Sequence, residues 1–293
     1  MSAGIHLDET LGVRTALAAL TRAFAAARLE TPDIDARFLL QGVLGIDGAR
    51  LHANPDAPLG SAAGAVRAAA LRRLNREPVS RILGWREFYG RRFAITPDVL
   101  DPRPDTETLI TLALDIAREN GWRDRQIRFV DIGVGSGAIA LTLLAEWPLA
   151  RAVATDVSRA ALEVTARNAC VFGVEDRLTL VEARGLGGCE GAFELVVSNP
   201  PYLPTGDIER LDPEVRRYDP LLALDGGRDG VNVYREIANE IIALKFKTQI
   251  ILEVGAGQAD AVIEIFDGIG GTSPRTLRDI GGHVRAVALE IHW

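Results

Sequence analysis

The sequence predicts an α/β protein with a doubly wound, mostly parallel sheet, preceded by a helical domain and a β-hairpin. Three observations support this fold class. After about residue 105, helical patterns alternate with short apolar stretches rich in β-branched residues, which is typical of successive βαβ units. Before about residue 84, apolar residues recur at helical spacing. Between these regions, aromatic residues flank Gly90, as they do in a hairpin.

The length of 293 residues is enough for about two domains. We predict a helical domain over residues 1–84, a β-hairpin and linker over 85–104, and the sheet domain over 105–293. The apolar share of 47% and the charged share of 25% are close to those of globular proteins. Disordered, collagen-like and purely coiled-coil chains are therefore excluded.

The N-terminal domain contains three predicted helices. An apolar stripe over residues 11–29 predicts the first. Thr31, Pro32 and Asp33 predict the start of the second, because they offer a capping hydroxyl, a fixed φ in the first turn and a negative charge at the positive end of the dipole. The third helix is expected over residues 61–74.

The linker and the sheet domain follow in order. The hairpin is expected over 86–95, and Asp105 is the predicted N-cap of the next helix. A long loop is expected from residue 199 to about residue 228. The predicted helices span residues 106–118, 138–146, 159–169, 231–244 and 258–266, and the predicted strands span about 127–132, 152–156, 178–181, 194–198, 249–254, 275–279 and 284–290.

Charge and composition exclude two further classes. The net charge is −7, with +2 on residues 1–84 and −9 on the remainder, which argues against a protein that coats nucleic acid electrostatically. Cys170 and Cys189 are too far apart in the sequence to form a metal-binding pair, and the four histidines are scattered. The sequence therefore predicts no metal site.

We expect a cytoplasmic protein without a membrane segment. Asp8 and Glu9 precede the first apolar run, whereas a signal peptide begins with basic residues. The alanine-rich stretch over residues 16–27 contains Arg22 and is too short to span a bilayer.

A glycine-rich turn follows the first strand of the sheet domain. Glycines let the chain turn sharply and approach a ligand without a Cβ in the way, and the next helix supplies free N–H groups. An acidic residue ends the following strand, where a carboxylate can bond both hydroxyls of a ribose. The predicted nucleoside site consists of Asp131, Gly133, Val134, Gly135, Ser136, Gly137 and Asp156.

Two cofactors remain open for this turn. Gly133, Gly135 and Ala138 satisfy the relaxed dinucleotide pattern. The spacing of Asp131, Gly133, Gly135 and Gly137 instead fits the S-adenosylmethionine pattern of class I methyltransferases, in which Asp131 can face the ammonium of the cofactor directly or through water. A pyrophosphate would be repelled by that carboxylate, so the pattern favours S-adenosylmethionine.

The sequence Asn199-Pro200-Pro201-Tyr202 follows another strand of the same sheet. Two prolines make the loop stiff and leave carbonyl acceptors without N–H donors. Asn199 adds an amide oxygen and Tyr202 an aromatic face. Proline turns are common in loops, but the position beside the glycine turn favours a site that receives a planar NH2 group. These four residues are the predicted catalytic residues.

The chemistry of such a site is methyl transfer to nitrogen. The lone pair of an amide or aryl amine nitrogen is delocalised, so the nitrogen must be held in line with an activated sulfonium methyl group. Acceptors for the two N–H protons can favour that geometry and stabilise the charge that develops on nitrogen. A strong general base is not required if the proton leaves after transfer.

The sequence resembles the HemK/PrmC family, the N5-glutamine methyltransferases of peptide chain release factors. The resemblance covers about residues 75–290. It is carried by the stretches PVSRILG (78–84), REFYG (86–90), VLDPRPDTE (99–107), DIGVGSGAIA (131–140), VSNPPY (197–202), YDPLLALDGGRDG (218–230), LEVGAGQ (252–258) and DIGG (279–282).

The resemblance implies a class I methyltransferase (Rossmann-like) fold. It implies that the residues from Gly133 to Gly137, with Asp156, bind S-adenosylmethionine, and that the stretch from Asn199 to Tyr202 holds the substrate glutamine, with Asn199 also near the cofactor. Ala183 stands where the family has a bulky residue beside the adenine. The implied substrate is the glutamine of the GGQ motif in release factors, which the N-terminal domain would help to recognise.

Two other functions remain as alternatives. An amino-methyltransferase of adenine or cytosine in nucleic acid also uses an NPPY-type loop, which holds a flipped base. The negative charge and the absence of a basic run in the sequence disfavour it, so we expect no DNA partner. The third hypothesis is a cofactor-binding protein without catalysis, which an intact NPPY sequence disfavours.

Overall fold

The computed structural model describes residues 6–245 and 247–292. The chain forms two compact units. The first comprises the described chain up to Trp85 together with Pro213–Tyr218, and the second comprises residues 86–212 and 219–293 as far as they are described. In these ranges no helix is both long and apolar enough to cross a membrane.

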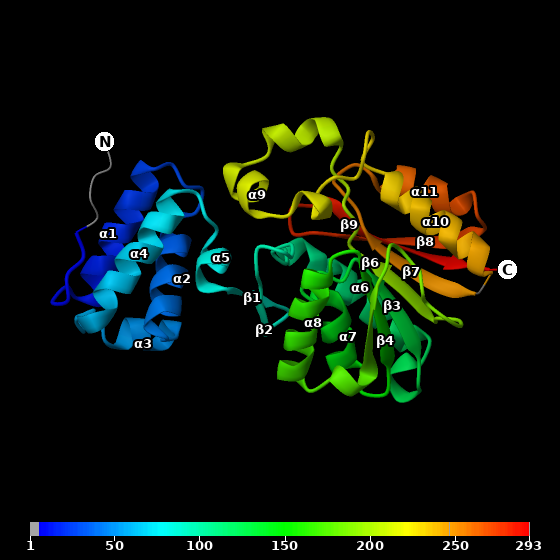
Figure 1. The fold of residues 1–293 in the computed structure, drawn as a ribbon, viewed down its shortest axis with the longest axis horizontal. Coiled ribbons are helices and arrows are strands. Elements are labelled where there is room, and N and C mark those ends of the chain that lie inside the picture. Colours follow the sequence, from blue (N-terminus) through cyan, green and yellow to red (C-terminus); the bar gives the residue numbers. More distant parts are fainter. Residues whose placement is uncertain (1–5, 246, 293) are drawn as a thin grey trace. The chain divides into compact units, whose positions relative to one another are not determined.

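The first unit is a bundle of helices around a small apolar core. The side chains of Leu20, Phe24, Leu39, Leu40 and Val66 are fully buried in it. The helices, drawn from blue to cyan in Figure 1, are α1 (Val13–Ala26), α2 (Pro32–Leu44), α3 (Gly48–Ala53), α4 (Ala63–Leu74) and α5 (Val79–Leu83), and the short helix α9 (Pro213–Tyr218) belongs to the same unit.

The predictions for this unit need three corrections, the first of which is that the five-residue helix α5 was not predicted. Thr31 precedes α2 as predicted, but its hydroxyl makes no capping bond and instead donates to Asp35 Oδ1 at 3.1 Å. Helix α3 was not predicted, because it is little more than one turn with a single buried residue, Leu51. Its sequence signal is the Asp47 side chain, which accepts a hydrogen bond from the Arg50 N–H at 2.8 Å.

A hairpin of β1 (Trp85–Phe88) and β2 (Arg91–Ala94) opens the second unit, with both turn residues at positive φ. The predicted N-cap at Asp105 is wrong. Asp105 lies inside a 3₁₀ turn, and α6 (Glu107–Glu119) begins after Thr106.

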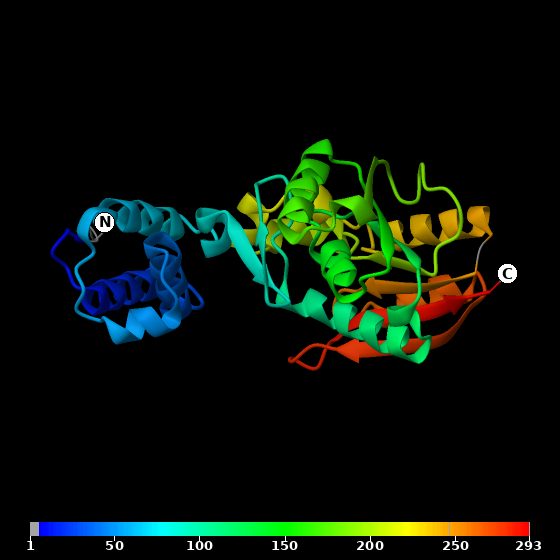
Figure 2. The same ribbon diagram turned by 90° about the horizontal axis from the view of Figure 1, so that it is seen from below.

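The predicted doubly wound sheet is confirmed. Seven strands lie in the order β5-β4-β3-β6-β7-β9-β8, with the first five of these parallel and β9 antiparallel to both of its neighbours. Their bounds are β3 (Arg128–Ile132), β4 (Arg151–Asp156), β5 (Leu178–Glu182), β6 (Leu195–Ser198), β7 (Thr248–Glu253), β8 (Gly271–Arg278) and β9 (Val284–Ile291). Figures 1 and 2 show helices on both faces of this sheet.

The sheet buries both of its faces. Phe129 and Val197 belong to the core under α6, α7 (Ala138–Glu146) and α8 (Arg159–Phe172). Their neighbours in the strands, Val130 and Val196, belong to the core under α10 (Asn232–Leu244) and α11 (Ala259–Asp267). This alternation explains why the parallel strands are continuous apolar runs in the sequence.

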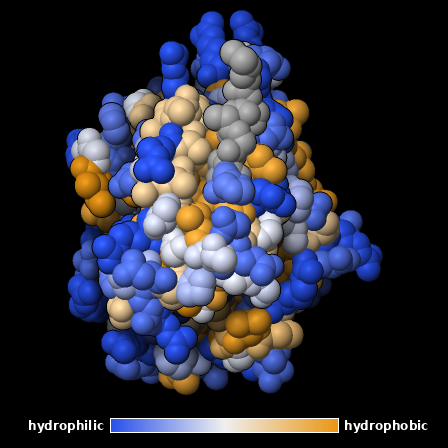
Figure 3. Space-filling model, turned by 90° about the vertical axis from the view of Figure 1, so that its left-hand side faces the viewer, coloured by the Kyte–Doolittle hydropathy of each residue, from blue (hydrophilic) through white to orange (hydrophobic). Residues whose placement is uncertain are grey.

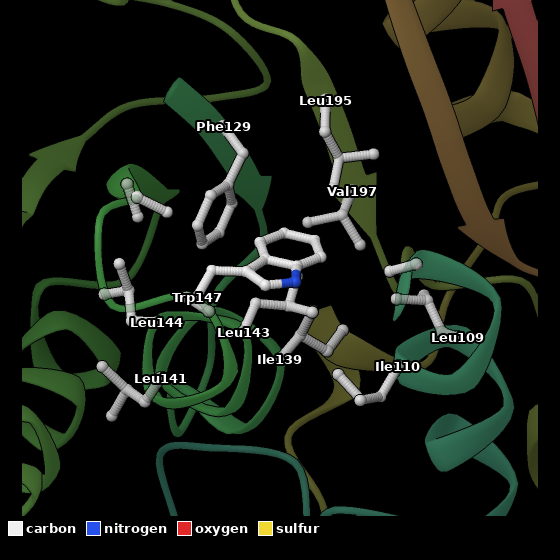
Figure 4. Packing of buried hydrophobic residues seen from close by; sticks show 14 of the residues in the cluster. Leu109, Ile110, Phe129, Ile139, Leu141, Leu143, Leu144, Trp147, Leu195 and Val197 are labelled. Carbon is white, nitrogen blue, oxygen red and sulfur yellow. The ribbon is translucent and has the colours of Figure 1, made fainter. Parts of the chain in front are cut away.

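The first of these cores is centred on Trp147. Its indole makes edge-on contacts with Phe129 at 5.9 Å and with Trp122 at 6.2 Å between ring centroids. Figure 4 shows the indole beside Val197 of the sheet and Leu143 of α7. The core fixes the glycine turn between β3 and α7 on a rigid base.

The segment predicted as a long loop contains short helices. One of them, α9, is tied to the first unit by Glu214, which accepts hydrogen bonds from Arg73 and Arg76, each at 3.1 Å. The side chain of Arg73 is only 6% exposed and also donates to Asp35 at 2.7 Å. The hydrogen bonds of Glu214 with Arg73 and Arg76 could not be predicted from the sequence, because these residues are more than 130 positions apart.

Candidate active site

A cavity of about 410 Å³ opens at the carboxyl ends of the parallel strands. Its size is within the usual range for a small-molecule site, and its place is where doubly wound sheets bind ligands. The wall is built entirely by the second unit. It includes Gly133, Val134, Gly135 and Ser136 of the glycine turn, Asp156, Ala183, Asn199, Pro200 and Pro201.

The glycine turn leaves open space at the cavity wall. Gly133 and Gly135 have φ of 74° and 55°, a conformation that favours glycine. A Cβ at Gly133 would meet no atom within 4 Å, so the side of the turn is clear for a ligand. Gly137, also predicted as a cofactor residue, does not line the cavity. A Cβ there would lie 2.8 Å from Leu141 and 3.1 Å from Thr165, so this glycine serves helix packing.

Asp156 holds the turn against the end of β4. Its Oδ2 accepts a hydrogen bond from the Gly135 N–H at 3.0 Å, and its Oδ1 accepts one from the Ser158 N–H at 2.9 Å. Each oxygen keeps a further lone pair, because a carboxylate has about four acceptor sites. Asp156 can therefore order the turn and accept hydrogen bonds from a ligand at the same time.

Asp131 lies behind the turn and does not line the cavity. It is 1% exposed, and its Oδ2 accepts a hydrogen bond from the Ala140 N–H at 3.0 Å. Burial raises the pKa of this carboxyl group to about 7, although the Ala140 bond opposes the shift. The structure therefore gives Asp131 a place in the support of the turn.

The Asn199-Pro200-Pro201 loop forms another part of the cavity wall. It is fixed by Ser198, whose hydroxyl donates to the Ile132 carbonyl at 2.7 Å, and by the Asn199 Nδ2, which donates to Thr106 Oγ1 at 3.2 Å. Both hydrogen bonds join β6 and its loop to other parts of the unit. They hold the loop at a fixed place beside the glycine turn.

Tyr202 does not line the cavity. Its ring packs against the core under α10 and α11, and its hydroxyl lies 3.5 Å from Glu253 Oε1. Burial is the main cause that raises the pKa of Tyr202 to about 12, and the nearby Glu253 carboxylate adds to the shift. Its carbonyl accepts a hydrogen bond from Gln258 Nε2 at 2.9 Å, so the residue anchors the end of the loop.

Several lining residues were not predicted. Arg184 donates three hydrogen bonds to Glu236 of α10, and the shortest N–O distance is 2.7 Å. Glu240 accepts a hydrogen bond from the Leu186 N–H at 2.7 Å. These partners lie more than 50 residues apart in the sequence, so no local pattern could reveal them. Thr106, the segment 97–100, Leu222, Ala223 and Asp225 also line the cavity, and the family resemblance was the sequence signal for most of them.

Among the described residues, no group of three or more His, Cys, Asp or Glu side chains could hold a metal ion.

The chain is similar in sequence to proteins of one known family. The family model of the PrmC N-terminal domain matches residues 15–84, and that of the methyltransferase small domain matches residues 112–210. The release factor glutamine methyltransferase of Cereibacter sphaeroides is 41% identical over 278 residues, which cover 94% of this chain and 97% of the relative. The chain belongs to the release factor glutamine methyltransferase family. It is accordingly a methyltransferase.

Two further comparisons agree with this family and fold. The family member of Bradyrhizobium diazoefficiens is 43% identical over 249 residues, 84% of each chain. The solved catalytic domain of hMettl16, in complex with an RNA hairpin, matches with a TM-score of 0.55 over 79% of this chain and 81% of that domain. At 16% identity this second likeness supports the fold alone.

Proposed function

We propose that this methyltransferase transfers a methyl group from S-adenosylmethionine to the side-chain amide nitrogen of the glutamine in the GGQ motif of peptide chain release factors. The observation that carries the proposal is one cavity with two different walls. One wall has the glycine turn and Asp156, and the other has Asn199, Pro200 and Pro201. The names of the relatives supply the substrate class.

The glycine wall fits a nucleoside-bearing methyl donor. The open side of Gly133 leaves room for the ligand, and the Asp156 carboxylate keeps acceptor sites for ribose hydroxyls. Ala183 and Arg184 border the same cavity at the end of β5, so they would lie toward the base. S-adenosylmethionine supplies a methyl group on a positively charged sulfur when it is bound.

The proline wall fits a primary amide. Asn199 and the two prolines line the cavity with acceptors on a stiff loop. Acceptors for both N–H protons would turn the nitrogen lone pair toward the methyl group and stabilise the charge that develops on nitrogen. Tyr202 stays neutral, since its pKa is raised to about 12, and it keeps the loop in place.

The N-terminal helical unit is the proposed recognition domain for the release factor. Ile34 and Phe38 are exposed on α2 and lie four residues apart, so they share one face of that helix. Figure 3 shows apolar areas among polar side chains on one side of the molecule. We also propose a cytoplasmic location, because release factors act in translation.

A methyl-transfer assay tests this function. The protein is incubated with radiolabelled S-adenosylmethionine and either purified release factor or DNA, and the label is mapped. We expect label on the GGQ glutamine and none on DNA, because the catalytic part of the chain carries a net charge of −9. Label on adenine or cytosine would instead support the amino-methyltransferase alternative, and label on neither would refute both.

A further inference from the structure

Thr106 occupies the N-cap position of α6 without capping the helix. An N-cap threonine usually accepts a hydrogen bond from a backbone N–H of the first turn, but the Thr106 side chain makes no such bond. The residue is 3% exposed and lines the cavity. Its Oγ1 instead accepts a hydrogen bond from the Asn199 side chain.

The direction of this hydrogen bond follows from the atoms that it joins. A threonine hydroxyl oxygen has two lone pairs and can accept, whereas an amide nitrogen can only donate. The Asn199 Nδ2 therefore donates to Thr106 Oγ1, at 3.2 Å.

An amide side chain has a donor end and an acceptor end. Because the Nδ2 of Asn199 is held by Thr106, its Oδ1 is the end available to the cavity that Asn199 lines. The opposite rotation would direct N–H groups at the NH2 group of a substrate, and two donors would then face each other. This rotation would also give up the hydrogen bond that Thr106 Oγ1 accepts from Nδ2.

We infer that Thr106 is a positioning residue for methyl transfer, which orients the Asn199 amide so that Oδ1 accepts from the substrate nitrogen. This inference rests on the proposed function, since it needs a substrate with an NH2 group. Two residues of the sequence Pro104-Asp105-Thr106-Glu107 then have different roles. Thr106 orients the catalytic loop, while Glu107 Oε1 accepts a hydrogen bond from the Tyr89 N–H at 2.8 Å and holds the hairpin turn.

A double-mutant cycle tests the inference in the full-length protein. Thr106→Val keeps the shape of the side chain and removes the hydroxyl, and Thr106→Ser keeps the hydroxyl. We expect Thr106→Val to lower kcat about tenfold with little change in KM for S-adenosylmethionine, and Thr106→Ser to restore most of the rate. Thr111→Val, which removes a hydroxyl bonded to a backbone carbonyl on the exposed side of α6, is the matched control and keeps the wild-type rate.

The Asn199→Ala background distinguishes positioning from a general structural role. If Thr106 acts through Asn199, adding Thr106→Val to Asn199→Ala lowers kcat by less than about twofold further. A further tenfold loss in that background, or equal losses in the Val and Ser variants, would overturn the inference. A wild-type protein that does not methylate release factor refutes the proposed function instead, so the two failures are separable.

Discussion

Asn199 is the residue on which the proposed chemistry depends most. It lines the cavity, and its amide is fixed by Thr106 at 3.2 Å. We expect Asn199→Ala to lose at least about tenfold in rate, since an oriented acceptor for a developing charge contributes on the order of 2–4 kcal/mol. Much of the affinity for S-adenosylmethionine is kept, because the glycine turn is untouched. Steady-state kinetics and calorimetry check the two parts, and an unchanged turnover contradicts the role.

Asp156 is the residue on which the proposed binding of S-adenosylmethionine depends. In Asp156→Asn, the amide places an NH2 group either against the Gly135 N–H or against the Ser158 N–H, both of which the carboxylate accepts in the wild type. We expect the dissociation constant for S-adenosylmethionine, measured by titration calorimetry, to rise by about tenfold or more. Asp176→Asn, an exposed aspartate before β5, should leave it unchanged. Equal affinity in both variants would remove Asp156 from the binding site.

At the scale of elements, α9 is held by an ion-pair cluster in the first unit. Glu214→Ala leaves the buried Arg73 guanidinium with Asp35 as its remaining carboxylate partner in the cluster. We expect a loss of about 2 kcal/mol in the free energy of unfolding, below the full cost of an unpaired buried charge. Urea denaturation measures it, with the exposed Glu175→Ala as a control. An unchanged midpoint would show that the cluster does not stabilise the fold.

The bounds of some helices and strands could be predicted from the sequence, and others could not. Helix α7 begins and ends where predicted, because Gly137 at φ 83° marks its start and its apolar residues are buried. Strand ends differ by one to a few residues, since terminal residues pair less regularly. Helix α3 is too short to show a helical period, so its cap at Asp47 is its one local signal, and α9 depends on contacts with Arg73, which is distant in the sequence.

The two loops of the site could be predicted from the sequence because each follows a strand. The side-chain contacts that hold these loops in place could not be predicted. The glycine turn and the proline loop are contiguous in the sequence, and the parallel topology brings them to one edge of the sheet. Tyr202 was predicted to offer its ring to the substrate, but the ring packs against the core under α10 and α11, with its hydroxyl 3.5 Å from Glu253 Oε1. The contacts of Arg184 with Glu236 and of Thr106 with Asn199 exist only after folding.

At the scale of the whole molecule, two buried carboxyl groups couple stability to pH. Burial raises the pKa of Asp131 and that of Glu253 to about 7 each, so the folded state holds these protons more tightly than the unfolded state does. Their stabilising contribution is complete below pH 4 and is lost as the pH rises through 7. Between pH 5.5 and pH 8 the free energy of unfolding should fall by about 2 kcal/mol for each group.

Denaturation at these two pH values checks this linkage. The lowered pKa values of Asp225, Asp229 and Asp279 do not interfere, because these carboxyl groups stay ionised throughout the range. Asp131→Asn and Glu253→Gln should each remove about half of the pH dependence. A wild-type stability that rises from pH 5.5 to pH 8 would contradict the assignment.

The position of the transferred methyl group decides the central proposal. Release factor is incubated with the protein and isotopically labelled S-adenosylmethionine, and tandem mass spectrometry locates the label. We expect one labelled methyl group on the side-chain nitrogen of the GGQ glutamine, and none when that glutamine is replaced by asparagine, because the shorter side chain does not bring its amide to Asn199 and the two prolines. Label on another residue of the release factor, or equal labelling of the asparagine variant, would contradict the proposed function.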